Sequence, residues 1–349
     1  PRLNYTTGVA NPYLLLEPSR TNLFSQSEYF GSSYWTKSGA SVVSGFTSPE
    51  GLSNAYKLVE DTSTGGHQIF RRIVVTATDN YASLYAKPSG RDWIVLYDTY
   101  RDQGRYFNIS TGVIGGVYRF APVSEFIEPF QNGYYRIGIG VTSSTIDYQL
   151  QVLLADSDGG AVYTGDGTSG AYIYGAQLEA GSYPTSYIPT YSVSATRAQD
   201  VCNKLDASDL IGTEFTLFFD GYQSIESQYS RYIVLKGTAG TYVNFISIET
   251  NPNNKVGVNV NAGSSVFTAT TQRTSGERLK MALRCKDNDF AFYINGVLIK
   301  SQTSGSVPVT SDLYLGYYTD YAENYNVINQ TQIYKEALTD AELATLTTI

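Results

Sequence analysis

The sequence predicts an all-β protein built from two tandem antiparallel β-sandwich domains of the jelly-roll type. Its 349 residues include 31 Tyr and 32 Gly, and only 16% are charged. Tyr and Thr favour strands, and Gly supplies tight turns. Short segments of alternating polarity follow one another, with turn residues about every ten positions. At roughly 100–200 residues per domain, the length indicates two domains.

The first domain is expected over residues 1–198, with an N-terminal arm and a C-terminal strap. Its predicted strands are 40–44, 55–60, 67–77, 81–87, 93–99, 134–141, 146–155 and 171–178. In the strand 93–99, Trp93, Val95 and Tyr97 share one face, and Ile94 and Leu96 share the other. Because both faces are partly apolar, the outer face of this sheet should be covered or should bind a ligand. Pro184 and Pro189 cannot donate backbone hydrogen bonds, which predicts an extended connector over 183–190, packed across the domain.

The second domain is expected over residues 199–349, with strands at 215–220, 232–236, 242–249, 255–260 and 278–285. Asn295-Gly296 predicts a type I′ turn in a hairpin over 290–300, because both central residues of that turn need positive φ. Thr339 and Glu342 have the spacing of a capping box, which predicts a short helix. The two cysteines, Cys202 and Cys285, are expected to be thiols, with a single bridge left open.

Several segments resemble known structural families. Residues 14–23, 54–61, 106–113 and 163–190 resemble the carbohydrate-binding-module-like jelly roll of phage tail and other virion proteins; Tyr174 precedes Gly-Ala-Gln-Leu-Glu where that group often has Trp. Residues 215–220, 290–297, 313–318 and 333–343 resemble the concanavalin A-like lectin/glucanase fold in its laminin-G-like form. The first resemblance implies a location in the virion, in a tail or fibre. The second implies little about activity, because such domains bind sugars or proteins, cut glycans or only pack.

The sequence offers no catalytic constellation. Glycan hydrolysis normally needs two carboxylates about 5–9.5 Å apart. The acidic residues of the second domain are scattered, without a partner two residues away: Glu226, Glu249 and Asp320. Glu60 and Asp61 should point to opposite faces of a strand and are expected to be solvated. A Ser-His-Asp triad would have to use His67, the single histidine, and the sequence has no Gly-x-Ser-x-Gly motif to supply the serine. A non-catalytic protein is therefore expected.

The glycine-rich segment 165–170 lacks the Gly-Lys-Ser/Thr ending of a phosphate-binding loop. Three carboxylates lie in or near it: Asp156, Asp158 and Asp166. They could hold Ca²⁺ together with loop carbonyls, or they could be Asx-turn residues. No other cofactor is expected.

Aromatic side chains are the main candidate for ligand binding. Aromatic rings pack against the apolar faces of sugars, and polar side chains bind the hydroxyls. The candidate glycan-binding residues are Trp93, Tyr97, Tyr100, Arg101 and Tyr106 in the first domain, and Tyr229, Arg231, Tyr317, Tyr318, Asp320 and Tyr321 in the second. Tyr34 and Trp35 form a further candidate pair. The structural alternative is that these tyrosines are core residues or contacts of a homotrimer.

The net charge of −8, without a basic patch, argues against nucleic acid and anionic membranes as partners. No apolar run approaches the ~20 residues of a membrane span. A start at Pro1 is typical of a fragment or processed chain. Arg20 and Glu179 are expected to form a hydrogen-bonded ion pair.

The predicted function is non-catalytic binding of host or environmental polysaccharide by an extracellular phage tail fibre or virion surface, alongside other virion proteins. The alternatives are a structural virion spacer and a polysaccharide depolymerase.

Overall fold

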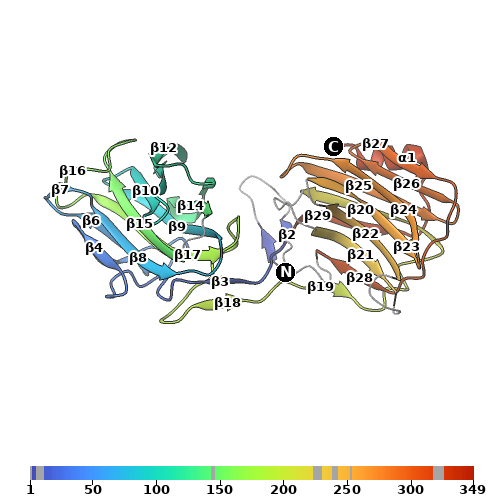
Figure 1. The fold of residues 1–349 in the computed structure, drawn as a ribbon, viewed down its shortest axis with the longest axis horizontal. Helices are drawn as coiled ribbons and strands as arrows, with labels where there is room; N and C mark the ends of the chain where they lie inside the picture. The colour runs from blue at the N-terminus through green and yellow to red at the C-terminus, as the bar shows by residue number, and fades with distance from the viewer. Residues whose placement is uncertain are drawn as a thin grey trace. The chain divides into compact units, whose positions relative to one another are not determined.

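The computed structural model describes residues 2–4, 12–142, 146–222, 230–237, 243–251, 254–316 and 326–349, with side chains from residue 12 onwards except that of residue 326. The chain divides into a first unit, Arg20–Arg197, and a second unit, which combines Pro1–Ser19 with Ala198–Ile349 (Figure 1). The N-terminal arm thus belongs to the second unit, whereas the sequence placed it with the first domain. The reason is a non-local pairing, because β2 (Tyr13–Leu16) lies antiparallel to β29 (Asn326–Tyr334).

The first unit is a sandwich of two antiparallel sheets, as the predicted fold class requires. Sheet I has the order β12 (Val113–Arg119), β11 (Gln103–Asn108), β10 (Trp93–Asp98), β15 (Asp147–Ala155), β8 (Gln68–Val74) and β4 (Thr36–Ser38). Sheet II has the order β13 (Ser124–Pro129), β14 (Tyr135–Thr142), β9 (Asp79–Ser89), β17 (Gly170–Ala180), β6 (Ala55–Glu60) and β5 (Ala40–Phe46). Smaller elements are the pair β3 (Arg20–Asn22) and β18 (Ala195–Arg197), the pair β7 (Thr64–Gly65) and β16 (Tyr163–Thr164), and the 3₁₀ turn Gln131–Gly133.

Successive side chains of a strand in sheet I point to opposite faces of the sheet. Ile94 and Leu96 of β10 are fully buried in the core between the two sheets. Val95 and Tyr97, one residue out of phase, pack in a separate cluster on the outer face of sheet I. The sheet therefore buries apolar side chains on both faces, as the sequence of this strand predicts.

The connector over residues 183–190 packs against the first unit. The Asn22 amide donates to the backbone oxygens of Ile188, at 2.8 Å, and Ala176, at 3.0 Å. The backbone N–H of Ile188 donates to Gln177 Oε1 at 2.7 Å. These bonds satisfy the extended backbone, which has no regular sheet partners there.

Arg20 and Glu179 form an ion pair, but the predicted hydrogen bond between them is wrong, because Nε and Oε2 lie 3.9 Å apart. The Glu179 carboxylate instead accepts from the backbone N–H of Thr185, at 2.9 Å, and from the Thr185 hydroxyl, at 2.6 Å. Glu179 therefore anchors the start of the connector.

The second unit also consists of two antiparallel sheets around one core. Sheet III has the order β1 (Arg2–Asn4), β2, β29, β20 (Glu214–Tyr222), β25 (Arg278–Lys286), β26 (Asp289–Ile294) and β27 (Val297–Gln302). Sheet IV has the order β19 (Cys202–Lys204), β28 (Asp312–Leu315), β21 (Ser230–Lys236), β22 (Asn244–Asn251), β23 (Lys255–Ala262) and β24 (Ser265–Gln272). The helix α1 (Asp340–Thr347) buries Leu343 against the outer face of sheet III.

Local signals in the second unit are confirmed. Asn295 and Gly296 have φ of 47° and 80°, as a type I′ turn between β26 and β27 requires. Cys202 and Cys285 are free thiols, and burial raises the pKa of Cys285 strongly. No helix in the described part of the chain is long and apolar enough to cross a lipid bilayer.

The capping box of α1 is present, with the Thr339 backbone N–H donating to Glu342 Oε2 at 2.8 Å. Replacing Thr339 with alanine should destabilise α1 by about 1 kcal/mol, because the helix N-terminus loses a side-chain acceptor. Amide hydrogen exchange over residues 340–347 should then be faster, roughly fivefold. Thr345→Ala, at an exposed position in the same helix, is the matched control, and equal acceleration in both variants would contradict the capping role.

Candidate functional site

The outer face of sheet I brings together aromatic side chains from three strands. In β10, Val95 lies opposite Tyr106 of β11, and Tyr97 lies opposite Gly104. On the next strand Gly104 pairs with Tyr118 of β12. A Cβ atom at residue 104 would lie 3.1 Å from the Tyr97 ring, so glycine lets the two tyrosines meet above it.

The tyrosines form a packed floor. The rings of Tyr97 and Tyr118 meet edge to face at 5.0 Å, and those of Tyr106 and Tyr118 at 5.7 Å. Tyr97 and Tyr106 are only 8% and 4% exposed. The Tyr97 hydroxyl donates to Asp102 Oδ1 at 2.5 Å, and burial, together with this carboxylate, raises the pKa of Tyr97. Trp93 and Tyr118 are half-buried, so their rings are the ones that a ligand can reach.

A carboxylate stands beside Trp93. Asp158, in the turn after β15, accepts a hydrogen bond from the backbone N–H of Gly116 through Oδ1, at 2.7 Å. A Cβ at Gly115 would lie 2.5 Å from Trp93 Cζ3 and 2.8 Å from Asp158 Oδ1. Glycine at position 115 is therefore what allows the indole ring and the carboxylate to lie against the same strand. We call Trp93, Tyr97, Tyr106, Tyr118 and Asp158 the tryptophan face.

Other residues predicted in the first unit lie outside the tryptophan face. The Arg101 guanidinium is 2% exposed, with Nη1 2.7 Å from Asp98 Oδ2. It is part of the framework and is not accessible to a ligand. Tyr100 is 41% exposed in the turn after β10, and Arg72 lies 5.5 Å from its ring centre. Trp35 is buried in the core at 1% exposure. The sequence prediction did not include Tyr118, and it proposed a metal-binding role for Asp158.

In the second unit Arg231 is held in a buried pair. Its Nε lies 3.1 Å from Glu249 Oε2, which also accepts from the Ser247 hydroxyl at 2.9 Å. The other predicted residues of this unit lie outside the described residues: Tyr229, Tyr317, Tyr318, Asp320 and Tyr321. Glu226 does so as well.

Two of the three aspartates proposed for Ca²⁺, Asp156 and Asp166, accept hydrogen bonds within their own loops, whereas Asp158 bonds to β12. Asp166 Oδ1 accepts from the backbone N–H groups of Thr168, at 2.7 Å, and Ser169, at 2.6 Å. The side-chain and backbone hydrogen bonds of Ser169 lower the pKa of Asp166 the most. Asp156 accepts from the Ser157 hydroxyl at 2.8 Å. Within the described ranges no three His, Cys, Asp or Glu side chains gather as a metal site would require.

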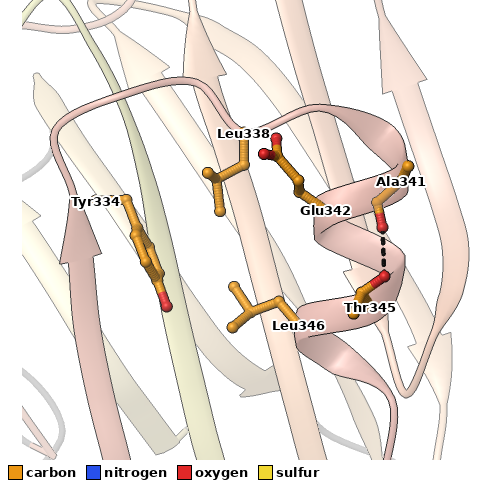
Figure 2. Close-up of a pocket in the computed structure, with 6 residues that line it drawn as sticks. All are labelled: Tyr334, Leu338, Ala341, Glu342, Thr345 and Leu346. Atoms are coloured by element: carbon orange, nitrogen blue, oxygen red, sulfur yellow. Dashed lines mark hydrogen bonds between the residues drawn. The ribbon is translucent and has the colours of Figure 1, made fainter.

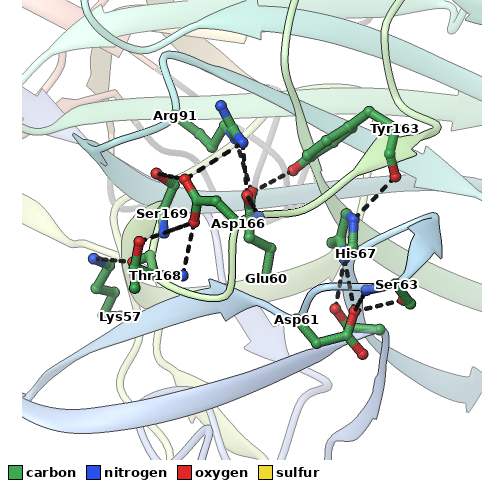
Figure 3. Close-up of polar contacts among 11 residues, drawn as sticks. Lys57, Glu60, Asp61, Ser63, His67, Arg91, Tyr163, Asp166, Thr168 and Ser169 are labelled. Atoms are coloured by element: carbon green, nitrogen blue, oxygen red, sulfur yellow. Dashed lines mark hydrogen bonds and ion pairs between the residues drawn. The ribbon is translucent and has the colours of Figure 1, made fainter.

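A buried network holds the glycine-rich loop (Figure 3). The Glu60 carboxylate at the end of β6 accepts two hydrogen bonds from Arg91, at 2.8 and 2.6 Å. It also accepts from the Tyr163 hydroxyl at 2.7 Å and from the backbone N–H of Asp166 at 2.8 Å. Asp61 points away and is exposed. The two side chains therefore do point to opposite faces, but the expectation that Glu60 is solvated is wrong.

His67 is fully buried beside this network. Its Nδ1 lies 2.6 Å from the backbone oxygen of Gly39, and its ring centre lies 4.7 Å from that of Tyr163. Figure 3 shows the imidazole pointing into the loop region between Asp61 and Tyr163. The His67 side chain therefore packs against the residues of the glycine-rich loop region and has no contact with solvent.

A pocket of about 410 Å³ lies between α1 and β29 (Figure 2). Its lining is Tyr334, Leu338, Ala341, Glu342, Thr345 and Leu346. The polar groups are used internally, because Glu342 completes the capping box and the Thr345 hydroxyl donates to the Ala341 backbone oxygen. The pocket therefore offers apolar surface without free polar groups that would orient a ligand.

No protein-family model matches the sequence, and a comparison with curated proteins gave no match. Among solved structures, the chain is similar to the CBM40 domain of a Ruminococcus gnavus IT-sialidase bound to α2,3-sialyllactose, with 16% identity over 42% of this chain and 91% of that one, and a TM-score of 0.37. It is similar to a heptameric SAP-like pentraxin from Limulus polyphemus, with 15% identity over 39% and 70% of the two chains, and a TM-score of 0.32. Similarities at this level carry no information about ligand or activity.

Proposed function

We propose that the chain is a non-catalytic glycan-binding protein and that the tryptophan face is its binding site. The observation that carries this proposal is the accessible Trp93 ring beside the fixed Asp158 carboxylate. An indole ring packs against the C–H face of a sugar, and a carboxylate accepts hydrogen bonds from the hydroxyls at its edge. Binding sites combine apolar surface with a few placed polar groups in this way.

The carboxylates of the tryptophan face are consistent with a protein that binds a glycan without cleaving it. A glycoside hydrolase normally uses two carboxyl groups about 5–9.5 Å apart, one on each side of the bond. Among the described residues, the tryptophan face contributes one carboxylate, the exposed Asp158, and the neighbouring Asp102 is half-buried and accepts a hydrogen bond from the Tyr97 hydroxyl. A depolymerase would need a second carboxylate facing Asp158.

We further propose that the protein serves as an extracellular adhesin on a phage tail fibre or virion surface, binding host or environmental polysaccharide alongside other virion proteins. This part of the proposal is supported by the sequence resemblance alone, which residues 14–23, 54–61, 106–113 and 163–190 carry.

A structural virion protein is the second candidate. The outer face of sheet II carries an aromatic cluster that includes Tyr85, Tyr134 and Tyr174, and Phe130 packs on Tyr85 while remaining 46% exposed. Exposed aromatic surface of this kind is found at oligomer interfaces. A homotrimer that buries Phe130 and shows no glycan binding would favour this function.

Screening the whole chain on an array of microbial polysaccharides and defined oligosaccharides tests the proposal. Saturable binding to at least one glycan is expected, with no release of reducing ends on prolonged incubation. Released reducing ends would favour the depolymerase. A complete lack of binding, together with a trimer in sedimentation, would favour the structural role.

A further inference from the structure

Asp158 is positioned from two directions. Its backbone lies in the turn after β15, where the N–H of Asp156 donates to the backbone oxygen of Gly160 at 3.0 Å. Its carboxylate is fixed by the Gly116 N–H of β12. The side chain is exposed, and no hydrogen bond among the described residues engages Oδ2. Oδ1 is thus held by the Gly116 N–H, and Oδ2 can accept a hydrogen bond from a ligand.

The charges around Trp93 are not balanced. No Lys or Arg of the described residues forms an ion pair with Asp158, whereas Arg105 pairs with Glu125 at 2.9 Å. Arg119 lies 5.5 Å from the ring centre of Tyr118. The Asp102 carboxylate accepts from the Tyr97 hydroxyl, near the other end of β10 from Trp93. The charge that stands beside the indole is therefore the negative charge of Asp158.

On this basis, and resting on the proposed glycan-binding function, we propose that Asp158 makes the tryptophan face selective for uncharged sugars. The apolar face of such a sugar packs on Trp93, and its hydroxyls donate to Asp158 Oδ2. A sugar that carries a carboxylate or sulfate at the same position meets the Asp158 carboxylate and is repelled, because like charges brought together away from water are disfavoured.

The test compares matched ligands. Neutral hexose oligomers are paired with the same oligomers after oxidation of the C6 hydroxyl to a carboxylate, and both are titrated into the whole chain by calorimetry at low salt. We expect neutral oligomers to bind at least tenfold more tightly than their oxidised counterparts. In Asp158→Asn, this ratio should fall to about threefold or less, because the amide keeps the size of the side chain but removes its charge.

Asp156→Asn is the control, since it changes an exposed acid of the same turn whose carboxylate is bonded to Ser157; the ratio should be unchanged. Equal or tighter binding of oxidised oligomers by the unmodified protein would overturn the selectivity but leave glycan binding intact. An unchanged ratio in Asp158→Asn would also overturn it. If neither neutral nor oxidised oligomers bind and the array is also negative, the proposed function itself fails.

Discussion

Replacing Glu60 with alanine is expected to lower the free energy of unfolding of the first unit by about 3–5 kcal/mol, because it removes one partner of a buried ion pair. Arg91 would lose both hydrogen bonds to Glu60 and keep the more distant Asp166 carboxylate, 3.8 Å from Nη2, while the Tyr163 hydroxyl and the Asp166 N–H would lose their acceptor. Unsatisfied donors of this kind cost about 1–3 kcal/mol each. A domain is typically stable by only about 5–15 kcal/mol, so the loss would be large.

Tryptophan fluorescence measures this loss selectively, because both tryptophans, Trp35 and Trp93, lie in the first unit. Asp61→Asn is the matched control. It changes the next residue, whose exposed carboxylate accepts from the Ser63 N–H at 2.9 Å, and it should destabilise the unit far less than Glu60→Ala, because water screens and solvates this carboxylate. Similar losses in Glu60→Ala and Asp61→Asn would show that the buried network does not hold the loop.

The same network makes stability depend on pH. Burial by itself would raise the pKa of Glu60, but hydrogen bonds from Arg91 and two further donors lower it below its ordinary value of 4.5. A depressed folded-state pKa adds stability above the unfolded pKa, and this contribution is lost as the pH falls through the folded value. The stability advantage of the unmodified protein over Glu60→Gln should therefore be largest near pH 7 and shrink below about pH 4.5.

Replacing Trp93 with alanine should weaken glycan binding by about 2 kcal/mol or more, which is roughly 30-fold. The indole provides the accessible apolar surface of the face, and alanine leaves no ring for a sugar to pack against. Calorimetric titration with a glycan identified on the array measures the loss, and the unfolding curve checks that the unit remains folded. Tyr100→Ala is the control, since Tyr100 lies outside the tryptophan face. A larger loss in Tyr100→Ala would move the site to the turn after β10.

The sheets could be predicted because their strands alternate in polarity and are bounded by turn residues. The prediction did not include β11, β12 and β13. Gly104, Gly115 and Gly116 interrupt the apolar pattern of β11 and β12, and glycine has low strand propensity. Because these glycines have no Cβ, they leave room for side chains of other strands, such as Trp93 against Gly115. The arm at β2 was misplaced because its partner, β29, is more than 300 residues away.

The candidate site could be predicted only in part. Trp93 and Tyr97 were found because the period of two places them on one face of a strand, and Tyr106 was included because it lies in the same strand-loop-strand region of the sequence. Tyr118 was missed because it lies on β12, a strand that the prediction did not include, and Asp158 because its contact with Gly116 joins residues 42 positions apart, which no local pattern shows. Arg101 was predicted because it is close in sequence, but the turn after β10 directs its guanidinium to Asp98.

The most direct test of glycan binding at the tryptophan face is Trp93 emission during titration with an array-positive glycan. Trp35 is 1% exposed in the core, so a change in tryptophan emission on binding should come from Trp93. We expect a saturable change whose midpoint matches the calorimetric Kd, and its absence in Trp93→Phe. Calorimetric binding with unchanged Trp93 emission, and with full affinity in Trp93→Ala, would contradict the assignment of this face as the binding site.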